Sequence, residues 1–471
     1  MTVVLTGHGL DLESLLRVAR GGEEAEIAPA ALEAMAAARA VVEEALAEDR
    51  EVYGLTTGVG ARKRFHAPAE ADAFNRRLLL DHRVSQGPLV TDDVARAATL
   101  LHANHLAAGW AGARPELAQA LAASLRGPAP AIRVFGSVGM GDVAPLADLA
   151  HSALGDMPLA AGEGLALISS NAFSTALAAL ALADAETLLD TLDVAGALDL
   201  EAFAGNVAPF DPVAAAARDA GAAATSARLR ELLDGSYLNG EGAARNLQDP
   251  LSFRCLPQIH GAARDALDYA LARLGVELNA HQGNPLVSDG RIVPTASFDV
   301  LALAAALDLV RIALAPVVTC ATERALKLLQ SSFSGLPEGL GERPGLPAPA
   351  FSEFGVVLLA LSGEARLLAA PVSVDAGSST HHEGIEDHGT FAPLAARRLA
   401  EQVELTARVA AIELVLACQA VDLRGAAPLG RGTRAAYDAV RRLVPFTGAD
   451  DVAPQDLEPV RDLVRAGIVS S

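Results

Sequence analysis

The sequence predicts a mainly α-helical fold with a few short hairpins, on three observations. Apolar residues recur at helical spacing through most of the 471 residues. Alanine supplies much of the 51% apolar fraction and aromatic residues make up only 4%, which favours closely approaching helices over a sheet-based core. The helical pattern from Pro393 to Arg424 is much longer than an average globular helix, so we expect a bundle of long helices that share one core.

Polar caps mark two helices in the first quarter of the chain. Asp11 can cap a helix over residues 12–20. Thr91 can cap a second helix that runs through residues 94–109, and the two aspartates after Thr91 suit the positive end of its dipole.

Glycines mark the ends of two later helices. The apolar run from Pro250 to Leu274 stops at Gly275, and the long run that ends at Arg424 is followed by Gly425. Because glycine adopts the left-handed conformation that closes helices, we expect both helices to end at these positions.

Strands and connections are few. Residues 51–55 and 285–293 carry short strand signals, and the Gly- and Pro-rich residues 335–349 predict a surface connection between bundle helices. We expect an N-terminal helical domain over residues 1–200 and a central long-helix bundle with C-terminal helices over residues 201–471.

Charge and cysteine content disfavour several function classes. Lys and Arg number 37 against 58 Asp and Glu, a net charge of −21, which disfavours nucleic acid and anionic membranes as partners. Residues 165–183 form the longest uncharged run, but its Ser, Thr and Asn suit burial in protein rather than lipid. With three cysteines and no signal peptide, we expect a soluble cytoplasmic protein that acts on a small molecule.

A glycine-rich loop spans residues 136–142 and leads to a predicted helix. Its backbone amides point at a helix start and could hold an anion. The loop does not match the dinucleotide fingerprint, and the chain has no Gly-Lys pair for a P-loop. The alternative is a tight packed turn in which Asp142 caps the next helix.

Tyr53 and Arg254 are candidate site residues. Tyr53 precedes a loop of Gly and Thr and can act as a general base if nearby cations or donors lower its pKa; a turn tyrosine in water is the alternative. Arg254 lies at the entrance of a long apolar helix and can clamp a substrate carboxylate through two parallel bonds. A structural pair with Asp249 is the alternative there.

Three histidines and three acids crowd residues 381–388. The segment lacks the HExxH pattern, because Glu386 stands where the second histidine belongs. Density alone does not supply the convergent geometry that a metal needs, so we predict no metal site.

Taken together and in this order, these segments resemble the histidine and aromatic amino-acid ammonia-lyase family, which includes phenylalanine and tyrosine lyases and aminomutases. The resemblance runs from about Tyr53 to about Gly425. It implies a bundle of the ammonia-lyase (fumarase/aspartase-like) type and a homotetramer whose active sites draw on more than one subunit. It rests on VYGLTTGVG, LLLDHRVSQG, GSVGMGDVAPLADLA, GEGLALISSNA, QDPLSFRCLPQIHGA, QGNPLV, ASFD, VSVDAGSST and IEDHGTFAP.

The resemblance also implies a prosthetic group that this loop does not supply. In the family, the serine of an Ala-Ser-Gly triad loses water and the glycine nitrogen closes on the alanine carbonyl, which gives a methylidene-imidazolone electrophile. Here the loop has Gly139, Met140 and Gly141, is one residue shorter and contains no Ser-Gly pair. We therefore expect neither the imidazolone nor another cofactor.

Other family positions are partly kept. The resemblance makes Tyr53 the base and Arg254 the carboxylate clamp. The family asparagine after EGLAL is Ser169 here, with Asn171 as a possible substitute, and Leu251 replaces the tyrosine of QDPYS. The positions retained from the family are Tyr53, Gln248, Arg254, Asn284, Phe298 and Glu386.

Selectivity positions resemble those of histidine lyases. Asp81 and His82 occupy one such pair, and Glu386 matches the histidine enzymes rather than the phenylalanine enzymes. These three residues predict a polar, acidic pocket end opposite Arg254. The expected ligand therefore has a carboxylate at one end and a basic or hydrogen-bonding group at the other.

The main hypothesis is an enzyme that works without the imidazolone. Tyr53 would be the base and Glu386 or His82 a second proton-transfer group. The substrate would be small, carboxylate-bearing and polar or basic, and the reaction an elimination of a better leaving group than ammonia, an isomerisation or a cyclisation. The alternatives are a catalytically inactive binding or scaffold protein and a histidine-type ammonia-lyase.

Overall fold

The computed structural model describes residues 2–68, 70–216, 218–345, 347–375, 384–425 and 427–468. Contacts divide the chain into two units, each assembled from three separate segments. Unit 1 comprises Met1–Ala181, Ala270–Leu307 and Pro371–Arg397, and unit 2 comprises Leu182–Tyr269, Asp308–Ala370 and Arg398–Ser471. The predicted division near residue 200 stays a prediction.

Unit 1 combines helices with three two-stranded sheets. β1 (Thr2–Leu5) pairs in parallel with β2 (Glu24–Ile27), β3 (Gln86–Leu89) pairs antiparallel with β4 (Arg133–Phe135), and β5 (Leu286–Ser288) forms an antiparallel hairpin with β6 (Arg291–Val293). Its helices are α1 (Leu12–Ala19), α2 (Pro29–Ala47), α3 (Ala71–His82), α4 (Asp92–Ala107), α5 (Pro115–Ser124), α6 (Val143–Leu154), α7 (Glu163–Ala166) and α16 (Val372–Asp375).

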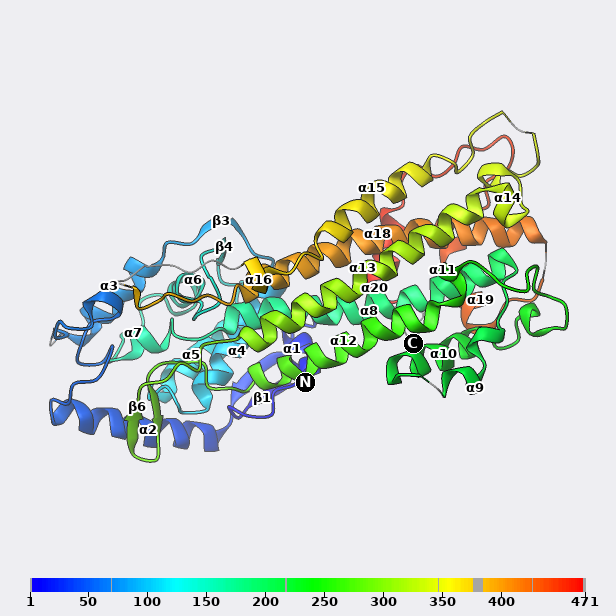
Figure 1. Cartoon of the computed structure of the whole chain (residues 1–471). Helices are drawn as coiled ribbons and strands as arrows, with labels where there is room; N and C mark the ends of the chain where they lie inside the picture. The colour runs from blue at the N-terminus through cyan, green and yellow to red at the C-terminus, as the bar shows by residue number, and fades with distance from the viewer. Residues whose placement is uncertain are drawn as a thin grey trace. The chain divides into compact units, whose positions relative to one another are not determined.

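The predicted helix starts in unit 1 are confirmed. The Asp11 carboxylate accepts the Ser14 N–H at 2.8 Å and caps α1. Thr91 precedes α4, although its hydroxyl donates to the Asp93 carboxylate at 2.5 Å rather than capping the backbone. The hairpin predicted over residues 285–293 is also confirmed, and it packs against α2 (Figure 1).

The strand predicted over residues 51–55 is wrong. The Leu55 and Thr56 N–H groups both donate to Val52 O, at 3.1 and 3.0 Å, so the segment turns back on itself. Gly54 has a φ of +70°, a left-handed conformation that a strand does not contain. The sequence EVYGL is apolar enough for a strand, but this glycine sets its local path.

Unit 2 is a bundle of long helices, as predicted, and α8, α13 and α18 lie side by side in it (Figure 1). The boundaries between the two units fall within α8, α12, α13 and α18, so each of these helices contributes residues to both units. The helices that supply unit 2 are α8 (Ala172–Phe203), α9 (Pro212–Ala215), α10 (Ala220–Leu232), α11 (Leu251–Arg254), α12 (Leu256–Glu277), α13 (Leu301–Leu329), α14 (Ser331–Ser334), α15 (Phe354–Leu367), α18 (Ala392–Arg424), α19 (Arg431–Leu443) and α20 (Glu458–Ala466).

One of the two predicted helix ends is confirmed. α18 ends at Arg424, and Gly425 follows with a φ of +89°. The helix expected to stop at Gly275 instead continues to Glu277. A glycine inside a helix costs only about 1 kcal/mol, which the surrounding turns outweigh.

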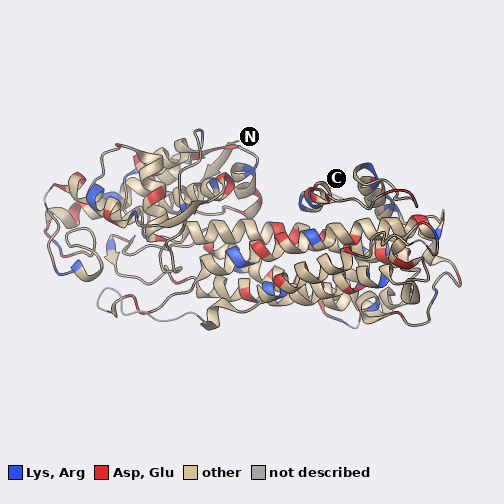
Figure 2. Ribbon diagram, turned by 90° about the horizontal axis from the view of Figure 1, so that it is seen from above, with Lys and Arg blue, Asp and Glu red and all other residues tan. Residues whose placement is uncertain are grey.

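Buried charges cross the core of unit 2. The Arg324 guanidinium contacts the carboxylates of Asp199 and Glu413 at 2.8 and 2.7 Å, and all three side chains are fully buried. Burial, together with the nearby Glu413 charge, raises the pKa of Asp199 well above its usual range. Figure 2 shows further acidic and basic residues along the long helices.

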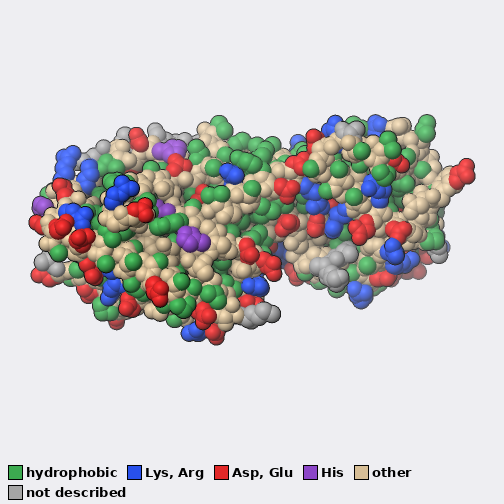
Figure 3. Space-filling view, turned by 90° about the horizontal axis from the view of Figure 1, so that it is seen from below, with side chains coloured by type: hydrophobic (Ala, Val, Ile, Leu, Met, Phe, Trp, Pro, Cys, Tyr) green, Lys and Arg blue, Asp and Glu red, His purple; other side chains and the backbone are tan. Residues whose placement is uncertain are grey.

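Three segments are long and apolar enough to cross a membrane by length and composition alone: Ala172–Phe203, Leu301–Leu329 and Phe354–Val374. In the structure, 78%, 56% and 28% of their most apolar windows are buried. Burial accounts for the first two segments. The third leaves an exposed apolar face that includes Val356 and Leu359. On the face of the molecule in Figure 3, apolar side chains are interspersed with charges of both signs.

Candidate active site

The glycine loop of residues 136–142 joins β4 to α6 in unit 1, and three of its amides donate to protein oxygens. The Gly139 N–H donates to Ser137 Oγ at 2.9 Å, the Gly141 N–H to Asn171 Oδ1 at 3.0 Å, and the Asp142 N–H to Ser170 O at 2.6 Å. These three amides are therefore not free to bind an anion, because protein oxygens occupy them.

The other side of the loop packs against the segment before α18. Thr390 Oγ1 donates to Gly139 O at 2.7 Å, and the Phe391 N–H donates to Val138 O at 2.8 Å. A Cβ added at Gly139 would lie 2.2 Å from Thr390 Oγ1, and its φ of +75° favours glycine. Met140, between the two glycines, pairs with Asp299 through the backbone.

Asp142 precedes α6 but does not cap it with its side chain. Its fully buried carboxyl accepts hydrogen bonds from the hydroxyls of Ser137 at 2.5 Å and Ser174 at 2.6 Å, and from the Ser174 N–H at 2.6 Å. Burial raises the pKa of Asp142, although these bonds oppose the shift. Asp142 therefore ties the loop to the start of α8.

Asn171 is fully committed to holding this loop. Besides accepting from Gly141, its side chain donates through Nδ2 to Phe298 O at 2.6 Å. Its own N–H donates to Gln282 Oε1 at 3.0 Å, and the residue is fully buried. Asn171 therefore joins the loop to the segment that carries the half-buried Phe298.

Four sequence-predicted residues line one cleft of about 700 Å³ in unit 1: Tyr53, Asp81, His82 and Glu386. They come from the loop after α2, from the last turn of α3, and from the segment before α18. Arg62 and Arg77 line the same cleft. The spacing along the chain gives no hint of this convergence, which the family motifs imply.

Tyr53 is half-buried, and its hydroxyl accepts the Gly60 N–H at 2.8 Å. Burial and, to a smaller extent, the Glu386 charge raise the pKa of Tyr53, which the Gly60 N–H opposes. A general base at this position was expected to have a lowered pKa, and the pKa of Tyr53 is raised instead. Tyr53 is a phenol at neutral pH, and a stronger base once it loses its proton.

The acidic end of the cleft is partly neutralised. Arg77 Nε pairs with the Asp81 carboxylate at 2.9 Å. His82 Nδ1 lies 2.7 Å from Leu78 O, the geometry of an Nδ1–H donor, which leaves Nε2 as an acceptor. Glu386 is exposed and remains the acidic side chain of the cleft without an ion pair among the described residues.

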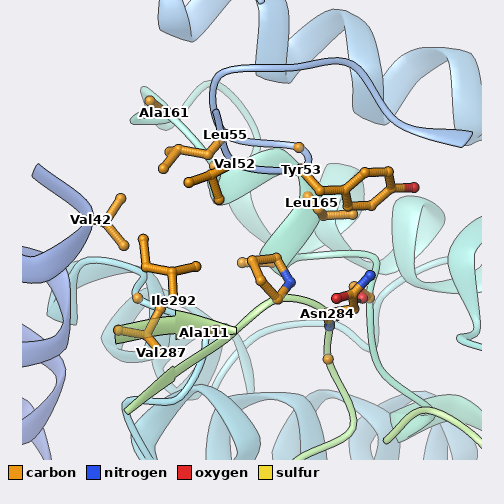
Figure 4. Close-up of a pocket in the computed structure, with 17 residues that line it drawn as sticks. Val42, Val52, Tyr53, Leu55, Ala111, Ala161, Leu165, Asn284, Val287 and Ile292 are labelled. Carbon is orange, nitrogen blue, oxygen red and sulfur yellow. Dashed lines mark hydrogen bonds between the residues drawn. The ribbon is translucent and has the colours of Figure 1, made fainter. Parts of the chain in front are cut away.

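A smaller cavity, the side chamber, lies beside the cleft and measures about 40 Å³. Val42, Leu55 and Ile292 form an apolar end, and Asn284 lies near the Tyr53 ring at the other (Figure 4). Asn284 Oδ1 accepts the Thr295 N–H at 3.0 Å.

Gln248 and Arg254 belong to unit 2, where the Arg254 guanidinium donates to Gln248 Oε1. The alternative pair with Asp249 is wrong, because the Asp249 carboxylate accepts from the Asn206 N–H at 2.5 Å and from Asn246 Nδ2 at 3.1 Å.

The described residues contain no group of three His, Cys, Asp or Glu side chains placed to hold a metal. His381, His382 and Glu383 of the histidine-rich segment lie outside them. His388 contacts the Asp299 carboxylate at 3.3 Å.

Sequence reasoning missed the residues that hold the loop, chiefly Thr390, Ser174 and Gln282. Gln282 lies in the QGNPLV motif, and Thr390 in IEDHGTFAP, so both were within matched stretches. Only their place in a family motif could have identified them, because a glutamine or a threonine does not by its residue type indicate a contact with the backbone.

Comparisons with known proteins show which family and which solved structures the chain is similar to. The family described as aromatic amino acid lyase matches residues 10–157 and 149–442. The histidine ammonia-lyase of Anaeromyxobacter sp. (strain K) is 37% identical over 99% of each chain. Among solved structures, the ergothioneine-degrading ergothionase of Treponema denticola has a TM-score of 0.92 at 29% identity, covering 99% of this chain and 98% of that one. Histidine ammonia-lyase of Trypanosoma cruzi has a TM-score of 0.90 at 28% identity, covering 99% and 94%.

Proposed function

The chain belongs to the aromatic amino acid lyase family, and on that premise we propose that it is a lyase-type enzyme that acts on a small amino-acid substrate by proton transfer alone. The observation that carries this proposal is Met140, which stands between Gly139 and Gly141 in the loop. A thioether has no hydroxyl to lose as water, so these residues do not fit a methylidene-imidazolone.

The hydroxyls beside the loop support the same conclusion. Ser137 is followed by Val138 rather than glycine, and its hydroxyl donates to Asp142. Thr390 donates to Gly139 O. Neither side chain belongs to a three-residue unit that could close into the ring.

The cleft residues can divide an elimination between them. Tyr53 gives up its proton to solvent, and the phenolate then removes a proton from a substrate carbon. The C–H electron pair becomes a double bond as the bond from the next carbon to the leaving group breaks, and Glu386 or His82, after taking up a proton from solvent, can pass it to that group. Without an electrophile to capture an amine, the leaving group must be better than ammonia. The similarity to ergothionase, which degrades ergothioneine, supports a substrate other than histidine, phenylalanine or tyrosine.

The substrate carboxylate is assigned to Arg254, with Gln248 beside it. We further propose that copies of the chain assemble as a homotetramer, so that Arg254 of one subunit serves the cleft of another. The exposed apolar face of α15 supports an assembly, because isolated soluble chains rarely expose a continuous apolar face.

Mass and turnover test this proposal together. We expect the intact protein to have the mass of its sequence with no loss of water, and no urocanate to form from L-histidine. Loss of water at residues 139–141 together with rapid urocanate formation would overturn it.

A histidine ammonia-lyase is the second candidate, and the comparisons favour it. The identity of 37% extends over nearly the whole chain, and His82 and Glu386 match the histidine enzymes. It would need a route to ammonia loss that the loop residues do not supply. The urocanate assay separates the two candidates directly.

A further inference from the structure

Apart from Tyr53, the residues that line the side chamber have no role in the proposed reaction. Tyr53 and Leu165 line both the chamber and the cleft, so the two cavities adjoin at these residues. None of the chamber's lining side chains, all from the described part of unit 1, carries a charge.

Two unused hydrogen-bond donors lie at the Tyr53 end. Ser169 Oγ accepts the Asn284 N–H at 3.1 Å, which leaves its own O–H available. Asn284 Oδ1 is taken by Thr295, and within the described residues Asn284 Nδ2 donates to no protein group. Both Ser169 and Asn284 line the chamber, and Figure 4 shows the Asn284 amide beside the Tyr53 ring, away from Val42.

Asn171 cannot supply these donors. Its side chain is fully buried and used by Gly141 and Phe298, and it does not line the chamber. Ser169, rather than Asn171, is therefore the polar residue after α7 that can meet a ligand.

The chamber selects a ligand group by charge and by size. A carboxylate placed there would lose its water without meeting a cation, which is costly. A neutral acceptor oxygen loses much less and gains the two donors. Because a water needs about 10–15 Å³ on this measure, 40 Å³ admits a group of about three non-hydrogen atoms.

We propose that the side chamber binds a neutral carbonyl or carboxamide group of the substrate through Ser169 and Asn284. The inference rests on the proposed function, because it assigns the far end of the substrate held in the cleft. Asn171 is then a positioning residue for the loop.

An isosteric pair of amino acids tests the ligand class. Calorimetry on the full chain would compare L-glutamine, which ends in a carboxamide, with L-glutamate, which has the same shape and a charge. We expect glutamine to bind at least about tenfold more tightly. Glutamate binding as tightly as glutamine would overturn the proposal.

Two substitutions locate the effect. Ser169→Ala should weaken glutamine binding about tenfold or less while leaving glutamate unchanged. Ala161→Leu, which fills the chamber, should abolish the preference for glutamine, and Ala131→Leu on the exposed surface is its matched control. An unchanged preference in Ala161→Leu would contradict the assignment.

A labelling experiment tests the chamber without any substrate. Ser169→Cys should react with methyl methanethiosulfonate, whose adduct adds one sulfur and one carbon, and glutamine should slow the reaction. Asn171→Cys should not react, and the wild type gives the background from its three cysteines. Labelling of Asn171→Cys but not Ser169→Cys would overturn the proposal.

These arms separate the two proposals. If neither amino acid binds while Ser169→Cys is labelled, the chamber is accessible as proposed and the amino-acid substrate class is wrong. If Ser169→Cys is not labelled although circular dichroism shows it folded, the chamber assignment fails whatever the substrate.

Discussion

The core of unit 2 and the glycine loop of unit 1 both depend on buried polar side chains, yet these side chains make different contacts. In unit 2, one guanidinium, Arg324, joins two carboxylates. In unit 1, neutral amides and hydroxyls such as Asn171 and Thr390 hold the loop backbone. The difference teaches that the bundle tolerates buried charge at residues that have no role in the proposed reaction. The acidic side chain of the loop, Asp142, likewise accepts hydrogen bonds from neutral groups of Ser137 and Ser174.

Removing the central charge of unit 2 should have the largest effect. Arg324→Ala leaves Asp199 and Glu413 buried without a cation, so we expect a loss of about 3–5 kcal/mol in the free energy of unfolding. Urea denaturation followed by circular dichroism measures it. A triple replacement by Met, Leu and Leu is the control and should recover most of the loss. A single-variant loss below about 1 kcal/mol would remove the contrast between the two regions.

Acid should affect unit 1 through its buried histidines. Burial lowers the pKa of His102 to about 3 and that of His105 and His281 to about 4. Between pH 6.5 and about 4 the unfolded chain binds protons that the folded chain does not, so stability is full above pH 6.5 and falls on acidification. Urea midpoints across this range measure the slope, and His105→Gln should flatten it. A slope that this variant leaves unchanged would assign the acid sensitivity elsewhere.

Breaking the neutral contacts of the loop should cost less than breaking the charge cluster. Asn171→Ala leaves the Gly141 N–H and Phe298 O without partners, for which we expect about 2 kcal/mol of destabilisation. Ser169→Ala, two residues away and beside the chamber, is the control, and we expect less than about 1 kcal/mol for it. Equal losses in the two variants would argue against a special role of Asn171 in the loop.

The cleft should respond to charge through Tyr53. Because its pKa is raised, the phenolate base is scarce at neutral pH and the rate should rise with pH up to at least 10. Glu386→Gln removes a charge that raises this pKa, so the rising limb of kcat/KM should move to lower pH, together with any loss of rate from the missing carboxylate. Tyr53→Phe is the control and should lack the limb. A limb that Tyr53→Phe retains belongs to another group.

The exposed pair between Arg77 and Asp81 should matter least for stability. Both side chains are more than half exposed, so Asp81→Asn should change the free energy of unfolding by less than about 1 kcal/mol. The same variant should weaken binding of a cationic ligand if Asp81 faces it. Thermal unfolding and calorimetry with L-histidine measure the two effects, and a large stability loss would place Asp81 in the fold rather than the site.

Much of the fold and the outline of the site could be predicted from the sequence. Caps and helical periodicity fixed α1, α4 and α18, and the order of motifs led to Tyr53, Asp81 and Glu386 in one cleft. What could not be predicted is competition for hydrogen bonds. The Asp249 carboxylate accepts hydrogen bonds from Asn206, which is distant along the chain, and from Asn246, which lies in the same turn. Arg254 therefore donates to Gln248 instead.

The choice between Asn171 and Ser169 shows the same limit. Both residues are small and polar, lie two positions apart and could each have faced a ligand. Which one has a free donor depends on the Gly141 amide and on Asn284, which lie 30 and 115 residues away along the chain. The residue type determines which hydrogen bonds a side chain can form. Backbone groups that are distant along the chain determine which of those bonds remain available to a ligand.

The interleaving of the two units has a consequence for how such a chain can be divided or recombined. Each unit draws on three stretches separated by stretches of the other. No single cut therefore separates the two units, and a crossover between homologous genes at one point between residues 182 and 397 would give each unit a mixed parentage. We therefore expect genes for chains with such alternating segments to be inherited whole rather than by exchange of modules.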